Sequence, residues 1–84
     1  MKSTRIAIID DHRIVTQAIS ELLGQFKDFK VVGVGFDGKD ALELVVSQKP
    51  DILILDLQLP NLSGSELLPI VKKAYPNLRV IILT

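Results

Sequence analysis

The chain has 84 residues, enough for one small domain, and 48% of them are hydrophobic, a share that excludes a disordered segment. Ten basic residues balance ten acidic ones, so we expect no direct binding of nucleic acid, which normally requires a basic excess. Cysteine is absent from the sequence, which excludes disulfides and thiolate metal sites. The apolar run at residues 6–9 is too short for a signal peptide or a membrane span, so we expect a cytoplasmic protein without a membrane partner.

Four short apolar segments alternate along the chain with longer segments that carry apolar residues at three- and four-residue spacing. Two of the short segments end in an acid, and such nearly continuous apolar runs are typical of strands buried on both faces of a parallel sheet. We predict strands at residues 5–10, 30–36, 52–56 and 79–83.

Three helices are predicted between these strands. The first is expected to bury an apolar stripe against the sheet, formed by Ile14, Ala18, Ile19, Leu22, Leu23 and Phe26. The second opens at Gly38 and ends at Pro50, because proline has no amide proton and disfavours helix in the residue before it. The third ends at Pro76. With Ser65 as its N-cap, Pro69 lies near the first turn, whereas a start two residues earlier implies a kink.

Strands that alternate with helices predict an α/β fold, in which a parallel sheet carries helices on both faces. Ligands of such sheets bind at the carboxyl ends of the strands. Asp10 and Asp11 follow the first predicted strand and Asp56 closes the third, so we expect three carboxylates to converge there. A hard divalent cation would relieve their mutual repulsion, and Mg²⁺ is the ion that fits oxygen ligands best.

A carboxylate beside Mg²⁺ can also act as a nucleophile toward a phosphoryl group. Thr84, after the fourth predicted strand, would offer a hydroxyl to the bound phosphate. A structural explanation remains open for each acid taken singly, because acids after strands often cap a helix or begin a turn. Asp11 or His12 could be no more than the cap of the helix that begins near Arg13.

Three segments of the sequence resemble the receiver domain of two-component response regulators, in order and in spacing. They are Asp10-Asp11, the stretch PDILILDLQLP at residues 50–60 with Gly64, and VIILT at residues 80–84. Residues 31–44 are similar to receivers from the helix-turn-helix transcription-factor branch.

The resemblance implies a flavodoxin-like doubly wound sheet of order 2-1-3-4 and a signalling module rather than an enzyme. Asp56 would accept a phosphoryl group from a sensor histidine kinase, and Thr84 would be the switch hydroxyl. Mg²⁺ would be held by Asp10, Asp11, Asp56 and the backbone carbonyl of Gln58.

The same resemblance implies a fourth helix, a fifth strand with a lysine, and a fifth helix, none of which the 84 residues include. We therefore expect residues 1–84 to be a partial receiver domain that ends with its fourth strand and carries no output domain. Strand 79–83 would then be an unpaired apolar edge and parts of both sheet faces would be bare. Self-association through that strand or those faces is expected.

Two other functions are compatible with parts of the sequence. Gly33, Gly35 and Gly38 match the GxGxxG pattern of dinucleotide-binding half-domains. The alternation of Val32, Val34 and Phe36 indicates instead a strand that continues through the first two glycines, and the pattern alone is weak. A receiver-like docking module that is never phosphorylated is the second alternative. His12 is assigned no chemistry, because a lone histidine at a helix start is more often a cap or a solvated residue.

Overall fold

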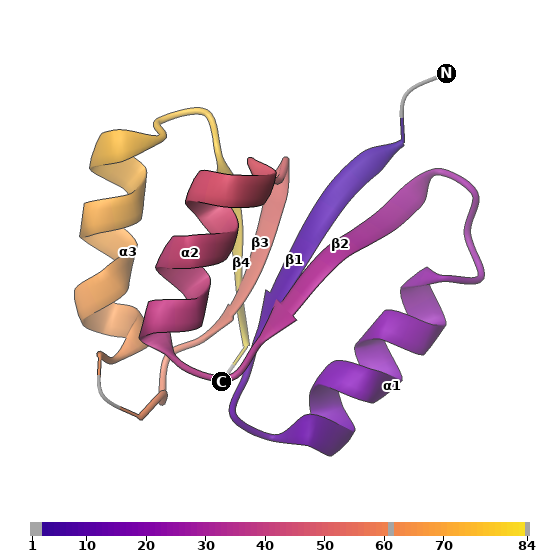
Figure 1. Cartoon of the computed structure of the whole chain (residues 1–84), viewed down its shortest axis with the longest axis horizontal. Helices are drawn as coiled ribbons and strands as arrows, with labels where there is room; N and C mark the ends of the chain where they lie inside the picture. Colours follow the sequence, from indigo (N-terminus) through magenta and orange to yellow (C-terminus); the bar gives the residue numbers. More distant parts are fainter. Residues whose placement is uncertain (1–2, 61, 84) are drawn as a thin grey trace.

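A computed structural model of the chain describes residues 3–60 and 62–83 (Figure 1). Strands and helices alternate from one end to the other, as the hydrophobic pattern predicts. In chain order they are β1 (Thr4–Ile9), α1 (Arg13–Leu23), β2 (Phe29–Gly35), α2 (Gly38–Gln48), β3 (Ile52–Asp56), α3 (Gly64–Ala74) and β4 (Arg79–Leu83).

The four strands form one parallel sheet in the order β2-β1-β3-β4, which confirms the predicted α/β fold and strand order. Helices α2 and α3 lie on one face of the sheet and α1 lies on the other (Figure 1). Because all strands point the same way, the residues that follow β1 and end β3 meet at one edge.

Alternate residues of the central strands enter two separate apolar clusters. Ala7 and Leu53 belong to the larger cluster, which packs against α2 and α3. Ile6 and Ile54 belong to the smaller cluster, which packs against Ile19 and other residues on the α1 side. The near-continuous apolar character of these strands therefore reflects burial on both faces.

The apolar stripe predicted for the first helix is only partly buried. Ile19 and Leu23 pack against the smaller cluster, but the other members are exposed, with 84% of Ile14, 56% of Leu22 and 51% of Phe26 accessible to solvent. The prediction failed here because, in the described part of the chain, α1 is the one helix on its face of the sheet, so no second helix covers its flank (Figure 1). A helical stripe shows which side chains share a face, but not how many neighbours cover that face.

The third helix begins at Gly64, with the side chain of Ser63 accepting a hydrogen bond from the backbone of Glu66 as its N-cap. Of the two starts that the sequence left open, the structure has the earlier one, and Ser65 is not the N-cap. Pro69 lies inside the helix and cannot donate to the carbonyl of Ser65. The pair Ser63 and Glu66 explains the earlier start, since the Ser63 hydroxyl accepts from the backbone N–H of Glu66 and also donates to the Glu66 carboxylate, each at 3.2 Å.

The glycines of the GxGxxG pattern serve packing. Gly33 and Gly35 lie inside β2, where a Cβ would meet the side chains of Leu44 and Asp40 on α2. The first turn of α2 is already capped, because Asp37 accepts from the backbone N–H of Asp40 at 2.8 Å. The carboxylates of Asp37 and Asp40 lie at the amino end of α2, where a pyrophosphate would have to bind. The glycine pattern therefore does not form a dinucleotide site.

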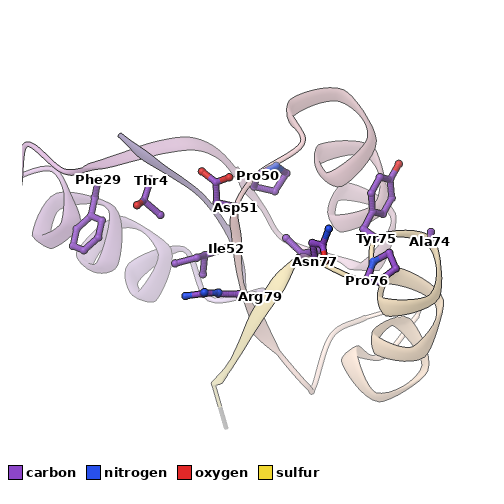
Figure 2. Close-up of a pocket in the computed structure, with 11 residues that line it drawn as sticks. Thr4, Phe29, Pro50, Asp51, Ile52, Ala74, Tyr75, Pro76, Asn77 and Arg79 are labelled. Carbon is purple, nitrogen blue, oxygen red and sulfur yellow. The ribbon is translucent and has the colours of Figure 1, made fainter. Parts of the chain in front are cut away.

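A cleft of about 650 Å³ lies at the opposite, amino-terminal edge of the sheet (Figure 2). Asp51 and Arg79 line it, together with Pro50 and residues of the turn between α3 and β4. This edge is remote from the carboxyl ends of β1 and β3. No helix within the described ranges is long and apolar enough to cross a membrane.

Candidate functional site

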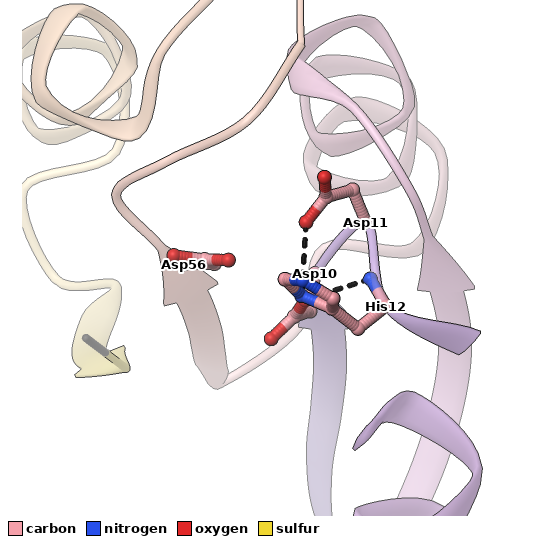
Figure 3. A group of neighbouring side chains, drawn as sticks. All are labelled: Asp10, Asp11, His12 and Asp56. Carbon is pink, nitrogen blue, oxygen red and sulfur yellow. Dashed lines mark hydrogen bonds and ion pairs between the residues drawn. The ribbon is translucent and has the colours of Figure 1, made fainter. Parts of the chain in front are cut away.

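Three carboxylates gather at the carboxyl edge of the two central strands (Figure 3). Asp10 directly follows β1 and Asp56 is the last residue of β3; the two strands pair in register, with Ile9 opposite Leu55. Ligand atoms of Asp10, Asp11, His12 and Asp56 all lie within 4.8 Å of one another. The convergence predicted for the three acids is thus confirmed, and a histidine joins them.

Asp10 is 4% exposed, and its carboxylate is fixed by neighbouring backbone. The Asp10 Oδ1 atom accepts a hydrogen bond from the backbone N–H of His12 at 2.8 Å, and the backbone N–H of Asp10 donates to the carbonyl of Gly35 at 3.2 Å. The second bond ties the end of β1 to β2. Asp10 is therefore a rigid, buried member of the cluster.

Asp56 is also buried, at 7% exposure. Its Oδ1 accepts a hydrogen bond from the backbone N–H of Gln58 at 3.0 Å, which closes a tight turn after β3. No donor within residues 3–60 and 62–83 hydrogen-bonds its other carboxylate oxygen, Oδ2. One oxygen is thus held in place while the other stays available for chemistry.

The imidazole of His12 bridges the acid pair. Its Nδ1 lies 2.7 Å from Asp10 Oδ1 and 3.1 Å from Asp11 Oδ1. The hydrogen bond to Asp10, then the negative charges of Asp11, Asp10 and Asp56, raise the pKa of His12 above its usual value of 6.5. No functional role is predicted for His12 from the sequence, although its place directly after an acid pair at a strand end pointed to this contact.

The loop after β3 is held close to Asp56 by Gly64. The backbone N–H of Gly64 donates to the carbonyl of Leu57 at 2.9 Å. A Cβ on Gly64 would overlap the backbone of Asp56 and lie 2.7 Å from Cα of Leu57. Only glycine allows this approach, so the residue noted in the sequence pattern fixes the loop against the site.

The remaining predicted residues are placed as follows. Gln58 lies in the loop after β3 with its N–H bonded to Asp56, and the role of its carbonyl stays a prediction. Thr84 lies outside the described residues.

Comparison with known proteins identifies the class to which this fold and acidic edge belong. The sequence pattern of the family described as "Response regulator receiver domain" matches residues 6–84. The chain belongs to that family, and so to the non-enzymatic signalling modules of two-component systems.

Regulators from bacteria are among its relatives. The chain is 40% identical over 80 residues to the response regulator protein VraR of Staphylococcus saprophyticus and 34% identical to the transcriptional regulatory protein DegU of Brevibacillus brevis. Both alignments cover 95% of this chain but only 38% and 34% of the relatives. The chain thus spans little more than a third of their length.

Solved receiver structures superpose closely on the chain. A structure of RcsB from Salmonella typhimurium has a TM-score of 0.92 at 31% identity, covering 100% of this chain and 44% of that one. The response regulator domain of Thermotoga maritima CheB has a TM-score of 0.90 at 33% identity, covering 96% of this chain and 60% of that one.

Proposed function

We propose that the chain is the phospho-accepting part of a response regulator and that Asp56 receives the phosphoryl group. One observation carries this proposal: a buried carboxylate at the end of β3 has one oxygen held by Gln58 and faces two further acids across the sheet edge. Family membership supports it, because receiver domains are signalling modules of two-component systems.

A metal ion belongs to the proposed chemistry, and the residues fit Mg²⁺. Carboxylate oxygens of Asp10, Asp11 and Asp56 lie within 4.8 Å of each other, and hard oxygen donors are what this ion prefers. The backbone carbonyl of Gln58 is proposed as a further ligand. When bound, Mg²⁺ neutralises negative charge on the phosphoryl oxygens.

In the proposed transfer, Oδ2 of Asp56 attacks the phosphorus of a phosphohistidine on a sensor histidine kinase. The new O–P bond forms as the P–N bond breaks. The electron pair of the P–N bond returns to the imidazole nitrogen of the kinase histidine, and that imidazole then takes up a proton. Asp56 is buried, which limits its contact with water, and the Gln58 N–H hydrogen-bonds Oδ1, so that Oδ2 is the oxygen left for the attack. Thr84 follows Leu83, which pairs with Asp56, and is proposed as the hydroxyl that hydrogen-bonds the phosphate.

The output and setting of the protein are proposed from its relatives. DegU is a transcriptional regulatory protein, and an RcsB structure is a complex with DNA. A further relative from Thermotoga maritima, 34% identical, is a protein-glutamate methylesterase. We propose transcription as the output, acting in the cytoplasm through a segment other than these 84 residues, which are proposed to be one part of a receiver domain.

Phosphorylation at Asp56 is tested on the protein as its gene encodes it. A small phosphodonor with Mg²⁺ should add one phosphoryl group, seen by intact-mass spectrometry and lost on mild alkaline treatment, as acyl phosphates are. Asp56→Asn should abolish the product. Asp51→Asn is the matched control, because Asp51 lies at the opposite edge of the sheet.

A phosphorylated product that survives in Asp56→Asn would contradict the assignment of the acceptor. No phosphorylation of either form would favour the docking module that is never phosphorylated.

A further inference from the structure

The acidic edge contains one side chain that the proposed phosphorylation does not use. His12 is the N-cap residue of α1, yet its side chain makes no capping hydrogen bond. Its ring is directed at the acids instead, with Nδ1 in contact with Asp10 and Asp11, and Asp56 lies across from it at the end of β3 (Figure 3). The backbone of His12 alone begins the helix, so its imidazole is free for another role.

The spacing around Nδ1 matches that of a metal centre. Asp10 Oδ1 and Asp11 Oδ1 both converge on this single nitrogen, at 2.7 and 3.1 Å. Neighbouring ligands of an octahedral ion with bonds of about 2.1 Å lie about 3.0 Å apart. A cation that replaces the proton on Nδ1 would thus meet a nitrogen and two oxygens with little movement of the chain.

The donor set also differs from one made of carboxylates alone. Mg²⁺ is a hard ion that takes oxygen ligands, whereas imidazole nitrogen raises the affinity for Co²⁺, Ni²⁺, Cu²⁺ and Zn²⁺. The sequence contains no cysteine and a single histidine, so its one imidazole lies in this cluster.

We propose that His12 is a nitrogen ligand of the acidic site and that it shifts the site's preference from Mg²⁺ toward divalent first-row transition ions such as Co²⁺ or Zn²⁺. The inference rests on the proposed metal site, and it adds a ligand and a class of ion. A transition ion held by Asp10, Asp11 and His12 would compete with Mg²⁺ beside Asp56, and so would regulate the phospho-acceptor.

The test compares Co²⁺ with Mg²⁺ by calorimetry on the wild-type chain and on His12→Ala. Loss of an outer ligand-orienting group typically lowers metal affinity by about 10–100-fold, so removal of a direct ligand should lower the Co²⁺ affinity by at least about tenfold. The Mg²⁺ affinity should stay equal or rise, because a competing imidazole is gone. His12→Gln, which keeps a hydrogen-bond donor without the ring, should behave as His12→Ala does.

A direct readout comes from the ring itself. In NMR spectra of the whole protein, the imidazole proton signals of His12 are assigned as those that disappear in His12→Ala. Titration with Zn²⁺ should shift these signals, and Co²⁺ should shift or broaden them strongly, while Mg²⁺ should have a smaller effect. Circular dichroism of each variant confirms that it is folded.

The outcomes separate this inference from the proposed function. If Asp56→Asn weakens both ions but His12→Ala leaves Co²⁺ binding unchanged, His12 is not a ligand while the metal site stands. If His12→Ala strengthens both ions equally, the imidazole only competes for the acids and the inference is overturned. If the wild-type chain binds neither ion, the metal site itself is wrong.

Discussion

The two faces of the sheet are built from the same apolar residue types but are covered to different extents. On the face toward α2 and α3, the larger cluster includes Leu53 and Leu55, both fully buried. On the face toward α1, Ile81 of β4 lies beside Ile54 and is 50% exposed. Two helices lie on the first face, whereas α1 alone lies on the second and packs mainly against β1 and β2 (Figure 1).

This difference teaches that alternation along a strand fixes the face on which a side chain lies, but not its burial. Strand β4 is the last in the sheet order, and two of its successive residues, Ile81 and Ile82, are exposed on opposite faces. The close packing of glycines follows the same division. Gly33, Gly35 and Gly64 all meet neighbours that a Cβ would overlap on the α2 and α3 side.

The largest difference in stability is expected between leucine-to-alanine substitutions on the two faces of the sheet. Leu53→Ala should lower the free energy of unfolding by about 2–5 kcal/mol, because a fully buried leucine leaves a cavity. Leu22→Ala, on the exposed flank of α1, should change it by less than about 0.5 kcal/mol. Urea denaturation of both variants measures the difference. Similar losses would show that the α1 side is covered in solution.

Self-association is the next expected effect. The exposed edge and face of β4 form a template for a second copy of the chain, so light scattering should show concentration-dependent association. Ile81→Lys should weaken it by at least about tenfold, since burial of an isoleucine contributes about 1.5–3 kcal/mol. Val46→Lys, on an exposed position of α2, is the control. A wild type that stays monomeric at high concentration contradicts the prediction.

A smaller effect on stability is expected when a Cβ is added at Gly64, where the loop after β3 lies close to the site. Gly64→Ala should destabilise the fold by about 1–3 kcal/mol, because the added Cβ would overlap the backbone at Asp56 and Leu57. Thermal unfolding measures it. Gly24→Ala should change stability far less, since the nearest atom to its Cβ is 3.3 Å away and its φ of −64° suits any residue. Equal losses of stability in Gly64→Ala and Gly24→Ala would show that the loop after β3 moves to accommodate the added Cβ.

The smallest effect on stability is expected from the contact of His12, at the start of α1, with the acids at the sheet edge. The pKa of His12 is raised in the folded chain, so its stabilising contribution is complete below the unfolded value of 6.5 and is lost as pH rises through the folded pKa. The free energy of unfolding should therefore fall slightly across this window in metal-free buffer. His12→Gln should flatten that slope. An NMR midpoint at or below 6.5 would contradict the raised pKa.

Much of the site follows from the sequence, because its acids stand at strand ends. In a parallel sheet the position of a residue along its strand fixes the edge at which it lies, so Asp10 and Asp56 were brought together by pattern alone. His12 was missed because its role depends on the direction of a side chain, which hydrophobic spacing does not encode. The start of α3 stayed open between two positions for a related reason, since Ser63 and Ser65 are equally good caps until the hydrogen bonds of Glu66 select one.

The sequence by itself determined the order of strands and helices, the parallel sheet and the edge that carries the acids, since apolar period and strand direction are local properties of the chain. Only the tertiary structure decided which apolar stripes are buried, how closely the Gly64 loop approaches Asp56, and that an imidazole stands among the carboxylates. These depend on which elements become neighbours, and contacts between residues far apart in the chain are set by packing of the whole domain.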